Sequence, residues 1–295
     1  MRSEATGRRY PRTMICAVYR LSRSTWYASG HTRSGMETSV VPVKRGPRSS
    51  WTDEDILLSI RQVLLESPFH GEGYRKVRAR LRARGISIGR NRVLRIMREN
   101  QLLAPVRRMA NHGDRRHEGR IQTDRPNELW GADAARFYTR EDGWCWFFGA
   151  IDHCSEDIVG WHVAKRGDRW AALEPIRQGI RAHYGDFAKK IALGLGLRHD
   201  WGPQYCAHQF LGELKWLGIR STPAYVREPE CNGIMERWIR TLKEECLYLH
   251  DFASLEEARE VIGEFIRHYN EEWLLERFGY RSPLAIRESL AQMAA

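Results

Sequence analysis

The chain lacks any apolar run long enough to cross a membrane. Its longest apolar stretches, residues 144–151 and 191–197, are far shorter than the roughly 20 residues that a membrane-spanning helix needs. The arginines of the first 14 residues are followed by no apolar segment and no small-residue cleavage site, which argues against a secretory signal. We therefore expect a cytoplasmic protein with no membrane partner.

Closely spaced cysteines are also missing. No two of the six cysteines lie within four residues of each other, so their spacing excludes a zinc ribbon or knuckle. In a reducing compartment they are expected to be buried apolar residues or free thiols. They are Cys16, Cys145, Cys154, Cys206, Cys231 and Cys246.

Positive and negative charges are divided unevenly along the 295 residues. Residues 1–127 carry 27 Lys and Arg against 11 Asp and Glu, a net charge of +16, whereas the remaining 168 residues have a net charge of −5. Such a basic front half is typical of a nucleic-acid-binding segment, and the acidic rear half has carboxylates available for divalent metal. The alternative, that the arginines only solvate helix surfaces, explains so large an excess less well.

The first 126 residues divide by composition into three segments. Residues 1–50 form a basic N-terminal segment and linker, partly helical, with one helical piece over residues 14–27. Residues 51–105 contain three short amphipathic helical patterns. Residues 106–126 carry six arginines without periodicity and form a basic linker that can lie along phosphates.

The three helical patterns of residues 51–105 predict a small all-α helix-turn-helix domain. Thr52 caps the first helix, the second follows Tyr74, and the third runs from a cap at Ser87 to about Asn100. The alternative is a basic helical bundle without a role in DNA binding. The inward positions of the third helix are Val93, Leu94 and Met97, and its outward, DNA-contacting positions are Arg90, Arg92, Arg95 and Arg98.

Residues 127–295 have the mixed pattern of an α/β domain. Three strands joined by short connections form an antiparallel meander, and a buried strand at residues 191–197 is expected beside the first of them. The order of elements suits a mixed five-stranded sheet with flanking helices. The expected strands are 129–138, 144–151, 158–163, 191–197 and a short one near residue 219; the expected helices are 168–184, 203–217, 231–249 and 255–270.

Three acidic residues lie on separate elements of this domain. Asp133 is inside the first strand, Asp200 follows the buried strand, and Glu236 lies on a helix, with 35 residues between the last two. If they converge, their mutual repulsion requires divalent cations, and magnesium prefers such oxygen ligands. Two ions bridged by Asp133, with one more carboxylate each, suit an in-line phosphoryl displacement.

Two cations share the helix face of Glu236. Arg240 and Lys243 follow it by four and seven residues, which places all three within about 40° around a helix. Such a cationic stripe can hold the DNA strand whose phosphate enters the metal site. The simpler alternative is an ordinary ion pair between Glu236 and Arg240.

The sequence around these acids resembles a known family. WGADAARFY around Asp133, LRHDWGPQY around Asp200 and ECNGIMERWIRTLKEE around Glu236 resemble the D-D-E signature of retroviral-integrase-like transposases. Within that family the chain is most similar to the second-reading-frame product of bacterial insertion sequences that make their transposase by frameshifting. The segment YRKVRARLRARGISIGRNRVLRIMRENQLL resembles the family's helix-turn-helix, and the resemblance covers about residues 54–290.

The resemblance implies an RNase H-like integrase catalytic core over residues 127–295. It implies a polynucleotidyl transferase that cleaves the 3′ ends of an insertion sequence and joins them to target DNA by transesterification, using two Mg²⁺ ions that Mn²⁺ can replace. The implied metal ligands are Asp133, Asp200 and Glu236, and the implied DNA-binding residues of the core are Asn232, Tyr205, Arg240 and Lys243.

The resemblance also implies partners and leaves two alternatives open. The implied partners are the element's ends, target DNA, further copies of the chain in a synaptic complex and a first-reading-frame product, on the nucleoid. The alternatives are a catalytically inactive DNA-binding protein and an RNase H-like nuclease without strand transfer. Departures from the family pattern, among them Cys231, Gly233 and Trp201, leave the three acids intact but change residues that orient them.

Overall fold

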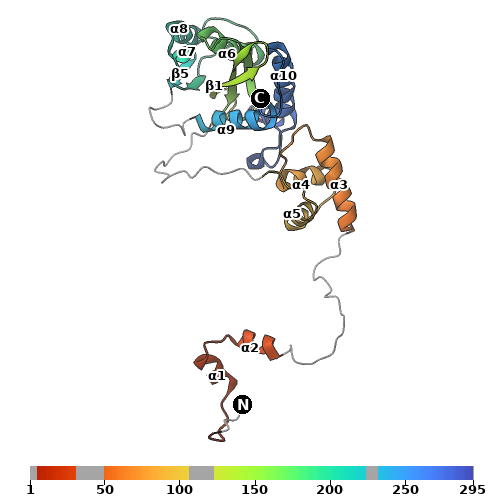
Figure 1. The fold of residues 1–295 in the computed structure, drawn as a ribbon. Helices are drawn as coiled ribbons and strands as arrows, with labels where there is room; N and C mark the ends of the chain where they lie inside the picture. The colour runs from red at the N-terminus through yellow and green to blue at the C-terminus, as the bar shows by residue number, and fades with distance from the viewer. Residues whose placement is uncertain (1–4, 31–49, 106–122, 224–231, 295) are drawn as a thin grey trace. The chain divides into compact units, whose positions relative to one another are not determined.

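The computed structural model describes residues 5–30, 50–105, 123–223 and 232–294 (Figure 1). The chain divides into two compact units, Met1–Ser50 and Trp51–Ala295. The first contains two short helices, α1 (Arg12–Val18) and α2 (Arg23–Gly30), within the region where one helical piece was expected. Among the described residues, no helix has the length and apolar character to span a membrane.

The second unit begins with three helices, as the sequence predicts. They are α3 (Asp53–Glu66), α4 (Tyr74–Ala83) and α5 (Arg90–Glu99). Thr52 caps α3 reciprocally with Asp55, because each side chain accepts the other's backbone N–H. Apolar residues of all three helices form one buried cluster, which includes Ile60, Val77 and Val93.

The start of α5 differs from the prediction. Its N-cap is Gly89 rather than Ser87. Ile86 and Ile88 are both buried while Ser87 between them is exposed, and this alternation requires an extended backbone before the helix begins. The inward position predicted for Leu94 was also wrong: it is only partly buried, and the buried residues of α5 are Val93, Ile96 and Met97.

A five-stranded mixed sheet forms the centre of the second unit, which confirms the predicted fold class. Its strand order is β3-β2-β1-β4-β5. The first three strands are antiparallel, whereas β4 runs parallel to β1 and β5 parallel to β4. The strands are β1 (Leu129–Thr139), β2 (Gly143–Asp152), β3 (Ile158–Ala164), β4 (Gly196–His199) and β5 (Arg220–Pro223).

The fourth strand is shorter and later than the predicted 191–197. Residues 191–194 form a turn in which Gly194 has φ +98°, a conformation that favours glycine. The backbone N–H of Ala192 donates to the carbonyl of Leu217 at 3.0 Å. Ala192 and Leu195 of the apolar run are buried while Leu193 is exposed, and only the last residues of the run enter the sheet.

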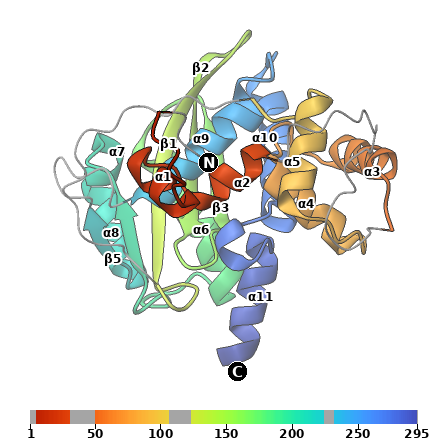
Figure 2. The ribbon, with the colours of Figure 1, turned by 90° about the horizontal axis from the view of Figure 1, so that it is seen from below.

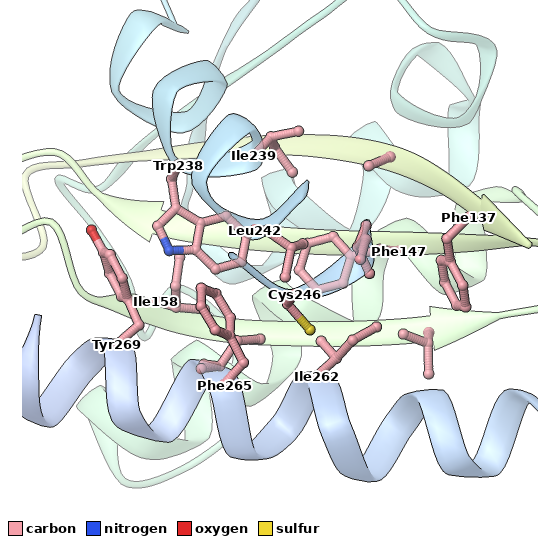
Figure 3. Packing of buried hydrophobic residues seen from close by; sticks show 14 of the residues in the cluster. Phe137, Phe147, Ile158, Trp238, Ile239, Leu242, Cys246, Ile262, Phe265 and Tyr269 are labelled. Atoms are coloured by element: carbon pink, nitrogen blue, oxygen red, sulfur yellow. The ribbon is translucent and has the colours of Figure 1, made fainter. Parts of the chain in front are cut away.

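Helices cover both faces of the sheet (Figures 1 and 2). The face with Trp130 and Phe148 packs on α6 (Arg169–Tyr184), α7 (Pro203–Cys206) and α8 (His208–Leu217). The other face packs on α9 (Gly233–Leu242), the π-helical turn η2 (Lys243–Leu247) and α10 (Leu255–Glu272). Figure 3 shows Trp238 of α9 between Phe147 of β2 and Tyr269 of α10. The short η3 (Glu276–Phe278) and α11 (Pro283–Ala294) complete the chain.

Two predicted helices are interrupted. The helix expected over 203–217 breaks at Ala207, whose backbone is extended. The break lets Tyr205 and Phe210, which an unbroken helix would point about 140° apart, both pack on His199.

The helix expected over 231–249 begins at Gly233 and becomes the π turn η2 after Leu242. Its expected first residue, Cys231, lies outside the described residues. Three consecutive residues of the π turn are buried, Glu245, Cys246 and Leu247.

Candidate active site

The three acidic residues lie on neighbouring elements at one end of the parallel strand pair. Asp133 is in β1, and Asp200 directly follows β4, which pairs with β1. Glu236 is in the first turn of α9, which packs against β1. Strand pairing and helix packing thus bring together residues that are up to about a hundred positions apart in the sequence.

The charges of these residues act on one another. The pKa of the partly buried Asp133 is raised to about 6, mainly by burial and further by the negative charges of Asp200 and Glu236. A hydrogen bond from the N–H of Ala134 and the positive charge of Lys243 act in the opposite direction. The charges of Asp200, Glu236 and Lys243 therefore all act on Asp133. The single positive charge does not offset burial and the two negative charges.

The chemistry of this donor set suits a divalent cation. Carboxylate oxygens are the ligands that hard cations prefer, and a bound cation would relieve the repulsion felt by Asp133. Across residues 5–30, 50–105, 123–223 and 232–294, no three His, Cys, Asp or Glu side chains are gathered closely enough to hold a metal ion as they stand. The three carboxylates thus lie near one another but do not form a closed metal site.

Asp200 is held by contacts that the sequence analysis did not assign. His199 Nδ1 contacts the carbonyl oxygen of Asp200 at 2.8 Å, and its Nε2 contacts Ser221 Oγ on β5 at 2.8 Å. The carboxylate of Asp200 accepts the N–H of Gly202 at 2.9 Å. The buried imidazole ties the turn that carries Asp200 to the next strand; its position beside the acid in LRHDWGPQY was the available signal.

Tyr205 lies in the core rather than on a DNA-facing surface. It is 1% exposed and stacks on His199 with ring centroids 5.5 Å apart. Burial raises its pKa well above the ordinary value, and the charges of Asp133 and Asp200 raise it further. The ring is therefore buried near the two carboxylates, where it can support their positions.

Asn232 is likewise buried and joins α9 to β1. Its side-chain Nδ2 donates to the carbonyl of Ala132 at 3.1 Å, one residue before Asp133. The space around it is tight, because a Cβ on Gly131 would lie 2.5 Å from Asn232 Oδ1 and 2.6 Å from His153 Nε2. His153 is buried, which lowers its pKa to about 4. Glycine at position 131 is what lets this amide and imidazole meet over the strand.

The cations of α9 lie on the predicted side. Glu236 and Arg240 are both exposed, Lys243 is partly exposed, and the intervening Ile239 and Leu242 are buried. Lys243 is close enough to Asp133 to lower its pKa. Glu236 and Arg240 thus lie on the exposed face of α9, and Lys243 follows as the first residue of η2.

The four arginines of α5 fall into two pairs. Arg92 and Arg95 both bond the carboxylate of Asp53 at the start of α3. Arg90 and Arg98 are exposed, and neither forms an ion pair within the described part of the chain. The structure therefore leaves the first and last of the predicted DNA-contacting arginines available and engages the middle two in holding the domain together.

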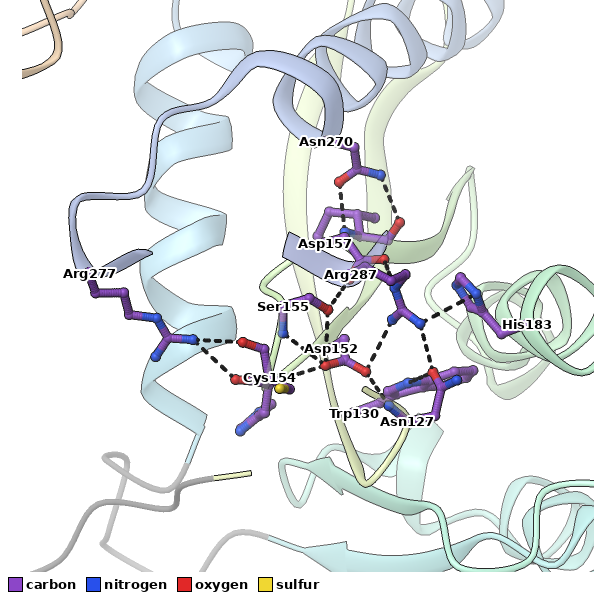
Figure 4. A network of polar contacts seen from close by, with 12 residues as sticks. Asn127, Trp130, Asp152, Cys154, Ser155, Asp157, His183, Asn270, Arg277 and Arg287 are labelled. Carbon is purple, nitrogen blue, oxygen red and sulfur yellow. Dashed lines mark hydrogen bonds and ion pairs between the residues drawn. The ribbon is translucent and has the colours of Figure 1, made fainter. Parts of the chain in front are cut away.

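A buried ionic network supports the loop that follows β2, and the sequence analysis missed it. Arg287 of α11 contacts Asp152 at 3.1 Å and Asp157 at 2.8 Å (Figure 4). The loop between these aspartates contains His153, whose carbonyl also faces Arg277 of η3. The end of the chain thereby fixes the loop that contacts Asn232. No short-range sequence pattern signals this pairing.

The chain matches three models of known protein families. Two models of the integrase core domain match residues 123–229 and 217–283, and a model of an HTH-like domain matches residues 51–110. The transposase InsD for insertion element IS2A/D/F/H/I/K of Escherichia coli is 30% identical over 260 residues, which cover 84% of this chain and 83% of the relative.

Solved structures of integrase cores are similar at lower identity. The catalytic core domain of BIV integrase is 21% identical, covering 57% of this chain and 98% of that one, with a TM-score of 0.42. The HTLV-2 integrase catalytic core domain in complex with magnesium is 16% identical, covering 55% and 97%, with a TM-score of 0.41. The identity and coverage of the insertion-sequence relative and the match to the integrase core domain together show the family. The chain therefore belongs to the integrase-like transposases of insertion sequences.

Proposed function

We propose that this transposase cleaves and joins DNA with Asp133, Asp200 and Glu236 as its catalytic carboxylates, holding two Mg²⁺ ions. The observation that carries the proposal is the placement of Asp133 in β1, Asp200 after the paired strand β4 and Glu236 on α9, where the charges of the other two acids act on buried Asp133. A structural carboxylate is normally placed beside a positive partner that lowers its pKa. One that is buried and faces two further acids is arranged to receive a cation.

The chain's own residues then divide the work. Asp133, on the rigid central strand, would contact both ions, and Asp200 and Glu236 would hold one each. Ions bound there supply an activated attacking oxygen and charge stabilisation for the leaving oxygen. Arg240 and Lys243, on the exposed side of the same helix, would hold the phosphates flanking the cleaved bond. Tyr205 and Asn232, which are both buried, would position the carboxylates.

The helix-turn-helix domain would supply DNA binding. Arg90 and Arg98 are exposed at the two ends of α5, where they can contact phosphates or bases. Each phosphate contact steepens the slope of log K against the log of the salt concentration by about 0.9. The DNA partners would be the element's ends and the target, with further copies of the chain in a synaptic complex and a first-reading-frame product as additional partners.

The proposal is tested by replacing each acid with its amide. Asp133→Asn, Asp200→Asn and Glu236→Gln should each abolish magnesium-dependent nicking and joining of labelled DNA that carries the element's ends. DNA binding, measured by gel shift without metal, should persist. Asp251→Asn is the matched control, because that side chain is 82% exposed and lies beside Arg140, which follows the end of β1.

The possible outcomes separate the competing functions. Cleavage that survives in all three amide variants would reject the metal site. Wild-type protein that binds DNA but neither nicks nor joins it would be an inactive DNA-binding derivative. Hydrolysis of the RNA strand of a hybrid without joining of DNA ends would identify a nuclease.

A further inference from the structure

The end of the β1–β2 hairpin carries a ladder of aromatic rings and one arginine. Arg136 faces Trp146 across the two strands, and Tyr138 faces Trp144. We call these four residues the hairpin patch. They share one face of the sheet because side chains alternate along a strand. Asp133, three residues before Arg136, lies on the other face, so the patch is separate from the carboxylates.

The rings of the hairpin patch are ordered by contacts with one another but remain open to solvent. The guanidinium of Arg136 lies 4.8 Å from the ring centroid of Trp144 and 5.4 Å from that of Trp146. Tyr138 meets Trp144 edge to face at 5.6 Å. Tyr138 and Trp144 are nevertheless 55% and 57% exposed. A cluster of exposed rings beside an arginine offers a surface to a binding partner.

The surroundings of the hairpin patch are positively charged. The loop before α6 lies directly on Trp146, since a Cβ on Gly167 would be 2.5 Å from the indole. That loop carries the exposed Arg166. Within the described residues neither Arg136 nor Arg166 forms an ion pair, whereas Asp142 pairs with Lys165 at 3.5 Å and Asp168 caps α6.

The hairpin patch also lies at an accessible edge. In Figure 2 the end of the β1–β2 hairpin, near the label β2, reaches the upper edge of the view. A hollow of ≈ 560 Å³ is lined by Arg166 of the loop that lies on Trp146 and by Trp170 of α6.

We propose that the hairpin patch binds unpaired bases of the DNA substrate by stacking. Aromatic faces interleaved with arginine bind single-stranded nucleic acid without sequence preference, because every base has a flat face and every linkage a negative charge. Bases at a nick or a cleaved end leave the duplex stack readily, whereas a base within an intact duplex must first be unpaired and unstacked before it can reach an exposed ring. Trp144 and Tyr138 would stack on the bases, and Arg136 and Arg166 would contact the flanking phosphates.

The inference depends on the proposed function only in taking DNA as the partner. It is tested on the full chain in EDTA, so that binding is measured apart from cleavage. The probe is a fluorescein-labelled oligo(dT) read by anisotropy. Trp144→Ala and Tyr138→Ala should each raise Kd for this probe by roughly 5- to 100-fold, and Trp144→Phe should recover most of the affinity. A blunt duplex should bind each variant within about twofold of wild type, since the helix-turn-helix supplies duplex binding.

Trp216→Ala is the matched control, because this tryptophan of α8 is 40% exposed but contacts Phe187 rather than an arginine. Its Kd for oligo(dT) should equal that of wild type. Photo-crosslinking of wild-type protein to an oligonucleotide with 5-iododeoxyuridine gives an answer even where a variant fails to fold, and the crosslinked peptide should contain residues 136–146. Crosslinks confined to other peptides, or an unchanged Kd in both alanine variants, would overturn the proposal. Loss of self-association in those variants at unchanged Kd would instead assign the patch to contact between copies.

Discussion

The carboxylate of Glu245 accepts the backbone N–H of His70 at 2.9 Å, and that of Gly71 at 3.1 Å. Glu245 is in the π turn that extends the helix of Glu236 and Lys243, whereas His70 and Gly71 lie in the loop between α3 and α4. Phe69 of the same loop packs edge to face on Trp273, with ring centroids 4.8 Å apart. The helix-turn-helix is thus fixed to η2, the continuation of α9.

Glu245→Ala should destabilise the protein and separate DNA binding from catalysis. Two part-buried N–H groups lose a charged acceptor, which costs at most about 1.5 to 3 kcal/mol per bond. We expect a lower midpoint in urea unfolding, near-normal gel shifts with duplex DNA, and a loss of strand joining of tenfold or more. Glu256→Ala, at a side chain that is 72% exposed, should change none of these. Equal losses of binding and joining would mean that the contact serves stability alone.

Gly131→Ala should impair cleavage while leaving the fold intact. The new methyl group would overlap Asn232 Oδ1 and His153 Nε2, so the Asn232 side chain must move and its bond to Ala132 is lost. We expect kcat for nicking to fall by tenfold or more with little change in DNA affinity. Gly233→Ala is the matched control, since nothing lies within 4 Å of its added Cβ. A Gly131→Ala enzyme of normal rate would show that this amide does not position Glu236.

Asp133→Asn should stabilise the protein at neutral pH when no divalent metal is present. The folded-state pKa is about 6, above the ordinary 3.8, so the folded state binds more protons than the unfolded state between these values. Stability therefore falls as pH rises through about 4 to 6 and stays reduced above. The substitution removes this loss, which we place at about 1 to 3 kcal/mol at pH 7.5 after allowing for partial exposure.

Wild type and Asp133→Asn also test whether Asp133 binds a divalent metal ion. Thermal unfolding from pH 4 to 8 in EDTA should show the two curves converging near pH 4 and separating by pH 7. Addition of MgCl₂ or MnCl₂ at pH 7.5 should raise the melting temperature of wild type but not of Asp133→Asn. A gap between the curves that is independent of pH would contradict the burial of an ionised Asp133.

Arg287→Ala should cost about 3 to 5 kcal/mol, because it leaves Asp152 and Asp157 as buried, unpaired carboxylates. Adding Asp157→Asn should restore part of that loss, which a urea double-mutant cycle would measure. Arg267→Ala is the comparison on the surface: its side chain is 52% exposed and pairs with Glu271, so its effect should stay below about 1 kcal/mol. Additive effects of Arg287→Ala and Asp157→Asn would show that the two side chains do not interact.

The sequence predicted the features that depend on local pattern. The capping of α3 by Thr52, the meander of β1 to β3 and the exposed face of α9 all follow from spacing and turn residues. The three acids were identified because each stands at a marked place, inside a strand, after a strand or on a helix face. The fold class also followed, since the order of elements limits how a mixed sheet can form.

Features that depend on tertiary packing were missed or misplaced. The break at Ala207 exists because two rings meet one imidazole, and the late start of β4 exists because a turn packs on the end of α8. Tyr205 and Asn232 carry polar groups, which favours a surface role from sequence alone, yet both are buried under the carboxylates. The partners of Arg287 and Glu245 lie more than a hundred residues away, so no short window of sequence reveals them.

The attachment of Glu245 to His70 also sets an order of events during synthesis. The ribosome completes the DNA-binding helices early, but the surface on which they rest requires residues 245–276, made roughly 10 to 40 s later at 5–20 residues per second. Arg287 emerges later still. A nascent polypeptide thus exposes its basic front half before Glu236 and the helix that carries it have been made.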